Sequence, residues 1–336
     1  MNRLRIFVLF AAMLVLAVGL AACGSSGGPQ AVVDEATLEG VESGDLDLSI
    51  GFDVKGGKGG HVDVKVEGPF QSEAGAELPK LDLTASATGT VEGKAVDFEG
   101  GLTLLGGIHA YVGYEGVEYK VDPVTFGFVR GMMQETKSGE PNELTACQQA
   151  VAGLDIGDFV EGATEEGTAD VGGTETTKVS GELDTAGAID ALIELTEDPA
   201  CGEQLDAAPG ALPSTAQLEK AKGEVQGAVK KAHVELYVGD DHIVRRLTAQ
   251  ATIEPREQSG GGGAESVDLD VDLTLTGVNE PQTIAAPAHS QPLTNLFLKL
   301  GISPFELLEV LEGKGGRGRG GINGLLEAIG GAGSNR

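Results

Sequence analysis

The fold depends most on residues 45–54, Asp45-Leu46-Asp47-Leu48-Ser49-Ile50-Gly51-Phe52-Asp53-Val54. Every second side chain is apolar, so five apolar groups share one face of an extended chain and polar groups or glycine occupy the other. This period of two is typical of an antiparallel strand with one face in water. A Gly/Lys-rich loop at residues 55–60 and renewed alternation at 61–67 predict a hairpin.

The same alternation continues along the chain in both directions from this hairpin. We expect further strands at residues 81–87, 96–104, 108–114, 117–121, 174–182, 233–238, 247–253 and 267–275. Residues 68–70 and 75–79 are expected to form a connection. Short turns join the N-terminal strands, which excludes parallel βαβ architecture there, because parallel strands need long crossovers. Helical spacing of apolar residues predicts helices at 31–41, 142–154, 184–198 and 214–230.

The N-terminus carries an export pattern. Arg3 and Arg5 precede an apolar run at residues 6–20, too short for a comfortable membrane span, and Leu20-Ala21-Ala22-Cys23 follows it. This spacing resembles the lipobox of bacterial lipoproteins, which implies that Cys23 is diacylated and becomes the mature N-terminus. The alternatives are a plain secretory signal and a single membrane-spanning helix. The Gly/Ser-rich segment after Cys23 favours the lipoprotein, because such a chain is a flexible tether. The expected location is the extracytoplasmic face of a bacterial cell membrane.

The domain organisation follows from these patterns. We expect a signal peptide at residues 1–22, a tether at 23–30, one half-barrel domain at 31–287 and a helical, Gly-rich extension at 288–336. Within the extension, Ser303-Pro304-Phe305-Glu306 reads as a capping box that begins a helix.

Composition limits the partners. Removing Arg3 and Arg5 from the 23 basic residues leaves 21 against 52 acidic ones, a net charge of about −31 for the mature chain. Such a chain repels nucleic acid and anionic lipid headgroups and favours a soluble monomer, so the anchor is expected to act without electrostatic help. The absence of Trp and the low aromatic content of 4% argue against sugar binding.

Cys147 and Cys201 remain once Cys23 is acylated. An even pair in an exported protein is most simply a disulfide, and closing a loop of about 54 residues would stabilise the fold by roughly 4 kcal/mol. The alternative is a thiol or metal site, for which the sequence offers no Cys-x-x-Cys pair and no neighbouring histidine.

Catalytic and metal-binding signals are weak. Asp268, Asp270 and Asp272 resemble part of a calcium loop, but Leu273 occupies the position where an EF-hand needs glycine. Their spacing of two is instead that of one wet strand face. The five histidines are scattered, and no nucleophile elbow or phosphate loop is present. We therefore assign no catalytic residue, metal or cofactor, and expect a protein that is not an enzyme.

Several stretches resemble one family when they are taken in order behind the lipobox. They are residues 38–43, 66–70, 110–119, 176–184, 234–239 and 243–247. Together they resemble the LppX/LprG-type lipoproteins of actinobacteria, which are related to the LolA/LolB half-barrel carriers. This resemblance implies an α+β fold, a curved antiparallel sheet with helices packed on its concave face and an apolar cavity between them. It also implies binding, and possible transport, of acyl lipids or lipoglycans, with an unidentified envelope transport partner.

The cavity would be lined by apolar residues of the sheet and of the 184–198 helix. The candidates are Leu46, Leu48, Ile50, Phe52, Leu81, Leu83, Ile189, Leu192 and Ile193. Each of them is equally compatible with an ordinary core. The alternative function is therefore a non-catalytic envelope scaffold or adhesion lipoprotein with a solid core.

Overall fold

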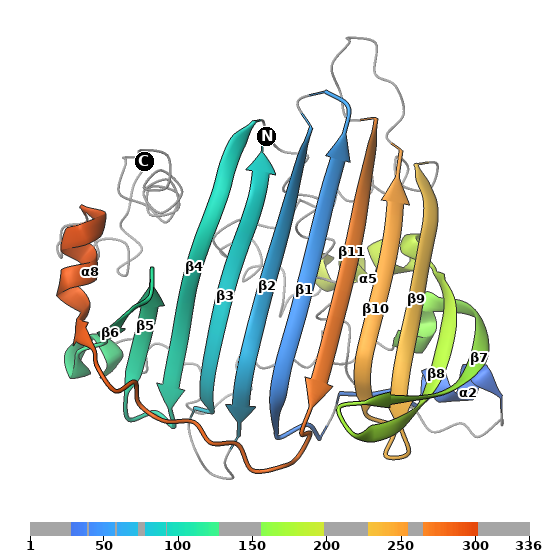
Figure 1. Cartoon of the computed structure of the whole chain (residues 1–336). Helices are drawn as coiled ribbons and strands as arrows, with labels where there is room; N and C mark the ends of the chain where they lie inside the picture. Colours follow the sequence, from blue (N-terminus) through green and yellow to red (C-terminus); the bar gives the residue numbers. More distant parts are fainter. Residues whose placement is uncertain are drawn as a thin grey trace.

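The computed structural model of the chain describes residues 28–38, 40–57, 59–72, 78–91, 93–127, 156–197, 228–254 and 265–301. In this part of the chain twelve strands form one open, curved sheet (Figure 1). Its order is β12-β6-β5-β4-β3-β2-β1-β11-β10-β9-β8-β7, and all neighbours are antiparallel except β12 and β6. The predicted α+β class with a curved antiparallel sheet is confirmed.

The strands differ greatly in length, from the long central ones to the two-residue β12. They are β1 (Ser43–Lys55), β2 (Gly60–Gln71), β3 (Lys80–Val91), β4 (Lys94–Leu105), β5 (Ala110–Tyr114), β6 (Val117–Lys120), β7 (Val160–Val171), β8 (Thr174–Leu183), β9 (Val229–Gly239), β10 (Val244–Ile253), β11 (Ser266–Thr276) and β12 (Gln291–Pro292). The helical elements include α2 (Pro29–Asp34), η1 (Ile156–Phe159), α5 (Thr185–Glu197) and α8 (Leu293–Leu300).

The stretch at residues 45–54 lies in β1, at the centre of the sheet. β1 pairs with β2 on one side and with β11 on the other, so Leu48 lies between Val66 and Leu273. The first and last long strands of the chain therefore meet in the middle. This arrangement explains why strict alternation is needed in both of them, since each has partners on both sides.

The β2 strand extends further than the sequence predicts. Residues 68–70 were expected in a connection, but β2 continues to Gln71 and Pro69 pairs with Asp45. Gly68 makes this possible: it adopts φ +135, and a Cβ there would collide with the carbonyl oxygen of Asp82 on β3. The glycine permits a close approach of two backbones rather than a turn.

The observed elements differ from the sequence predictions at three further places. β7 was not predicted at all, since its residues are mostly glutamate, glycine and threonine. The predicted helix at 214–230 overlaps the start of β9 at Val229. The first helix is α2, which begins at Pro29 and ends at Asp34, earlier than the pattern at 31–41 suggests. It ends there because the chain becomes extended at Thr37, which bridges to Ile243.

The predicted cap of the 184–198 helix is confirmed. The Asp184 carboxylate accepts hydrogen bonds from the backbone amides of Ala186 and Gly187, both at 3.0 Å. It thereby satisfies two of the free N–H groups at the start of α5.

The chain beyond β11 is attached to the sheet. Asn279 accepts a hydrogen bond from the Glu42 amide at 2.8 Å, and the Gln282 amide donates to Gln71 at 2.9 Å. The segment then follows the lower edge of the sheet in Figure 1 and enters β12, which pairs with β6. Residues 291–300 of the expected extension at 288–336 thus pack on the sheet, through β12 and α8. In the described ranges, no helix has the length and apolar character needed to cross a membrane.

Candidate functional site

One face of the sheet is mostly apolar from β6 to β9. The register aligns apolar residues across strands: Leu48 with Val66, Val66 with Ala85, and Leu83 with Leu102. The same face continues through Val112 on β5 and Tyr119 on β6. Polar and charged residues fill the opposite face, as the period of two requires.

Two closed hydrophobic clusters lie on this apolar face. The larger covers β8 to β11 and part of β1, and includes Val33 of α2, which is fully buried, and Leu236, which is 1% exposed. The smaller joins Tyr114 and Tyr119 to Leu293 and Leu296 of α8. α2 and α8 therefore pack on the same face, near opposite ends of the sheet.

Between the two clusters lies a less buried apolar surface on β2, β3 and β4, which we name the apolar strip. It consists of Val62, Val64, Val66, Leu81, Leu83, Ala85, Ala87, Val96, Leu102 and Leu104. These side chains belong to neither closed cluster. Leu102 is 41% exposed and the others are half-buried. From Leu81 to Ala87 the strip extends about 20 Å at ~3.3 Å per residue.

The predicted cavity residues are divided between these surfaces. Phe52 is buried in the larger cluster, and Leu46, Leu48 and Ile50 pack against it. Leu81 and Leu83 lie on the apolar strip, and Ile193 is half-buried on α5. The side chains of Ile189 and Leu192 lie outside the described residues. A lining role for these residues stays a prediction.

Sequence reasoning missed most of the strip. Val62, Val64, Ala85 and Leu102 alternate in the same way as the residues that were chosen, and could have been found by pairing successive hairpin strands. Their incomplete burial could not be found, because it depends on where α2 and α8 end in space.

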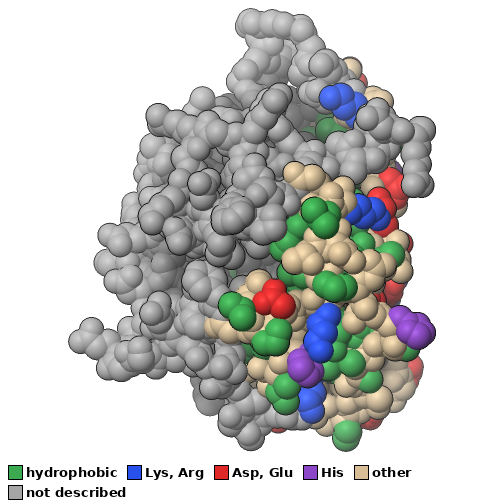
Figure 2. All heavy atoms as spheres, turned by 90° about the vertical axis from the view of Figure 1, so that its left-hand side faces the viewer, with side chains coloured by type: hydrophobic (Ala, Val, Ile, Leu, Met, Phe, Trp, Pro, Cys, Tyr) green, Lys and Arg blue, Asp and Glu red, His purple; other side chains and the backbone are tan. Residues whose placement is uncertain are grey.

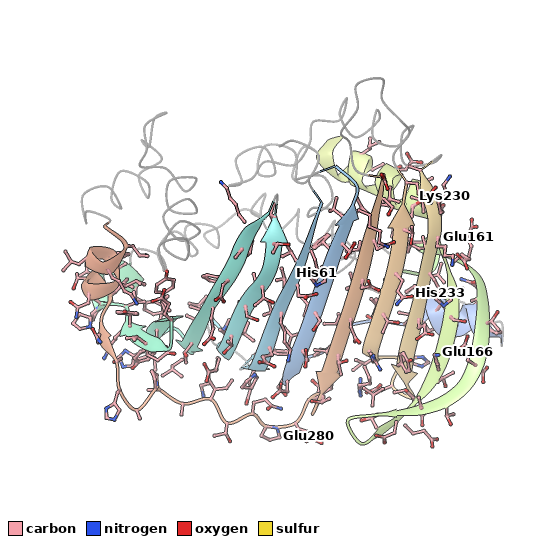
Figure 3. All side chains as sticks on the ribbon, turned by 45° about the horizontal axis from the view of Figure 1, so that its top comes forward. His61, Glu161, Glu166, Lys230, His233 and Glu280 are labelled. Atoms are coloured by element: carbon pink, nitrogen blue, oxygen red, sulfur yellow. The ribbon has the colours of Figure 1, made fainter. Side chains whose placement is uncertain are left out.

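The opposite face carries a polar groove of about 690 Å³ that crosses β1, β2, β3 and β9 to β11. Small residues such as Ser49, Gly51 and Ser86 line it, together with charged side chains that include Asp63 and Asp270. Nε2 of His61, which is labelled on β2 in Figure 3, lies 2.7 Å from a carboxylate oxygen of Asp63. Acidic side chains outnumber basic ones in the groove, in contrast to the uncharged apolar strip.

Lys178 is the centre of a charged network on this polar face. Its ammonium lies 2.7 Å from Glu166 and 2.9 Å from Glu235, and the hydroxyl of Tyr237 also donates to Glu235 at 3.1 Å. The hydrogen bond from Lys178 lowers the pKa of Glu166 and of Glu235 below the usual range for glutamate. The single ammonium thus offsets part of the charge of two carboxylates, which is a structural role.

The three aspartates of the calcium-like run do lie on one polar strand face, as expected. Asp268 binds Lys55 at 2.6 Å and accepts a hydrogen bond from Thr252, and Asp272 binds Arg246 at 2.6 Å. Among the described residues, no group of three or more His, Cys, Asp or Glu side chains is arranged to hold a metal ion.

Several predicted features lie outside the described residues. They are the signal peptide, Cys23, the first part of the tether, Cys147, Cys201 and the capping box at 303–306. Acylation and the disulfide accordingly stay predictions.

Comparisons with known proteins give structural likenesses only. No known family matches the chain, and no characterised protein matches it in sequence. Among solved structures, it is similar to LprF from Mycobacterium bovis, at 16% identity over 78% of this chain and 97% of that one, with a TM-score of 0.36. Lipoprotein LppX from Mycobacterium tuberculosis has 16% identity over 78% of this chain and 100% of that one, with a TM-score of 0.30.

A third solved structure is a LolA-superfamily protein from Nitrosomonas europaea. It has 8% identity over 77% of this chain and 96% of its own, with a TM-score of 0.17.

Proposed function

We propose that this protein is a cell-envelope lipoprotein that binds acyl lipids through the apolar strip and is anchored to the membrane by diacylated Cys23. The observation that carries the proposal is the incomplete burial of ten apolar side chains between two closed clusters. A continuous apolar surface that a folded protein leaves half open is a typical ligand-binding or interaction surface.

The chemistry of the strip fits an acyl chain. The described strip residues are aliphatic, without a charged or hydrogen-bonding side chain, so the ligand part that they contact is expected to be apolar. Burying a methylene group stabilises a complex by about 0.8 kcal/mol. Because the strip is about 20 Å long at ~3.3 Å per residue, it can bury many methylenes of one chain.

Co-purification of lipid tests the proposal. The exported chain is produced from Gly24 onward, which keeps Val33 and the rest of α2 in the core, and is studied by native mass spectrometry and lipid extraction. We expect bound acyl lipid in stoichiometric amount. A mass equal to that of the bare chain, with no uptake of added phospholipid, would instead favour the envelope scaffold with a solid core.

A further inference from the structure

A corner of the sheet combines exposed apolar side chains with positive charge. Ile108 lies in the turn between β4 and β5 and is 72% exposed, and Val124 follows β6 and is 82% exposed. His109 directly follows Ile108, and Lys120 is the last residue of β6, four positions before Val124; both side chains are exposed. Because β5 and β6 are antiparallel, the start of β5 and the end of β6 meet at one end of the hairpin. We name these four residues the basic–apolar corner.

Both apolar side chains are held on ordered backbone. The Ile108 amide donates to the Leu105 carbonyl at 3.1 Å, and the Leu105 amide donates to the carbonyl of His109 at 2.9 Å. On the other segment, the Asp122 carboxylate accepts hydrogen bonds from the amides of Val124 and Thr125 at 3.0 and 2.9 Å. The exposure of Ile108 and Val124 is thus a property of two fixed turns.

The corner is less acidic than the chain as a whole. Acidic residues outnumber basic ones by 52 to 23 in the sequence, whereas the corner holds Lys120 and His109 beside Asp122. Asp122 lies next to it, and its pKa is lowered by its hydrogen bonds to Thr125. In Figure 2, Lys and His side chains lie among hydrophobic ones in the lower half of the face shown, where acidic side chains are sparse.

We propose that the basic–apolar corner contacts the surface of an anionic lipid bilayer, with Ile108 and Val124 inserted below the headgroups. Apolar side chains flanked by Lys are the usual composition of a shallow membrane contact. Two side chains are too few for a stable protein interface, which buries about 800 Å² per partner.

The corner adjoins the end of the apolar strip. Leu104 pairs with Ala110 on β5 and with Leu81 on β3, and Leu102, the most exposed residue of the strip, follows two positions away on β4. An acyl chain that leaves the bilayer at Ile108 would therefore meet strip residues directly. In this respect the inference rests on the proposed function.

The expected anchor allows this contact. The six-residue step from Cys23 to Pro29 spans at most about 20 Å. α2 packs near β7 and β8, and the strands from β8 to β6 extend across about 43 Å at ~4.8 Å per strand. With the anchor at one end of the sheet, a tilt of the body can bring the corner at the other end to the bilayer surface.

Tryptophan fluorescence tests the contact, because the chain contains no Trp of its own. Ile108→Trp and Val124→Trp are made separately in the full acylated chain, which is reconstituted into phosphatidylglycerol/phosphatidylcholine vesicles with brominated acyl chains. The control is Ala95→Trp, an exposed position at the opposite end of β4. We expect bromine quenching several-fold stronger at 108 and 124 than at 95, and weaker quenching at 108 after Lys120→Glu.

Equal quenching at the three positions, or none at 108 and 124, would overturn the proposal. Failure of the proposed function is seen separately, in lipid extraction. A chain that carries lipid without quenching at the corner would lose only the membrane contact. Quenching at the corner in a chain without bound lipid would support the contact and count against the carrier function.

Discussion

At the scale of single residues, a substitution at Leu83 is expected to lower lipid affinity more than it lowers the free energy of unfolding. It lies half-buried on the apolar strip, whereas its neighbour Thr84 is exposed on the polar face. Under a bound acyl chain, the amide of Leu83→Asn would lose its water, which costs about 1–3 kcal/mol. We expect lipid affinity to fall about ten- to a hundredfold, and the free energy of unfolding of the lipid-free chain to fall by only about 1 kcal/mol.

Thr84→Asn is the matched control, since it places the same amide on the next residue but on the other face. Lipid titration and urea unfolding of both variants give the comparison. Equal affinity of the two variants for lipid would show that the apolar strip is not the binding surface.

Lys178 makes the stability of the polar face sensitive to acid. Its hydrogen bonds lower the pKa of Glu166 and Glu235 in the folded chain. The unfolded chain therefore binds more protons as the pH falls through about 4.3, the ordinary value for glutamate, and below it. The stabilisation is fully present above this range and is lost as the pH falls through the folded pKa values.

Lys178→Met should remove part of this dependence. We expect the free energy of unfolding to change less between about pH 5 and pH 3 in the variant than in the wild type, measured by urea unfolding at each pH. Lys231→Met, at an exposed lysine of β9, should leave the slope unchanged. The same reduction in both variants would mean that the slope reflects net charge, rather than the Lys178 network.

At the scale of elements, α8 shows whether the chain beyond β11 supports the body. Leu296 is 6% exposed in the smaller cluster, while Leu298 on the same helix is 72% exposed. Leu296→Ala leaves a cavity and should lower the free energy of unfolding by about 2 to 3 kcal/mol. Leu298→Ala should change it by no more than about 0.5 kcal/mol. Small effects of both substitutions in urea unfolding would mean that α8 is dispensable.

The elements also show what sequence can predict. β1, β3, β4, β10 and β11 were predicted because one face of each meets apolar neighbours, and this enforces alternation. β7 was missed because only β8 pairs with it and most of its side chains face water, so no apolar pattern is required. The role of α8 was missed because its partners, Tyr114 and Tyr119, are far away in sequence. The strip was only partly predicted. The face on which a side chain lies follows from the local alternation, whereas its burial depends on residues that are distant in sequence.

At the scale of the whole molecule, a single open sheet must satisfy two opposite demands. Among the described residues, its apolar face carries closed clusters with helices near both ends and less buried apolar side chains in the middle, where a ligand could add cover. Its outer strands must not pair with another copy of the chain, because unpaired strand edges promote association. Among the described strands, β7 is one of the two outer ones.

The composition of β7 is suited to preventing such pairing. Glu161 and Glu165 are exposed, Gly162 and Gly167 adopt positive φ, and the pairing with β8 shifts register at two places. Charge and bulges both oppose the addition of another strand. We therefore expect the exported chain produced from Gly24 onward to sediment as a monomer at all accessible concentrations.

Glu161→Thr/Glu165→Thr should allow the β7 edge to pair with another copy of the chain, because threonine favours strands and the substitution removes the repulsion between copies. The control, Glu175→Thr/Glu182→Thr, makes the same charge change on β8, which has a partner on each side. In sedimentation velocity, we expect concentration-dependent association of the β7 variant alone. Association of both variants would assign the monomeric state to the net charge of the chain, and association of neither would assign it to the bulges. Only association of the β7 variant alone would show that the glutamates of β7 keep this open sheet from pairing with another copy.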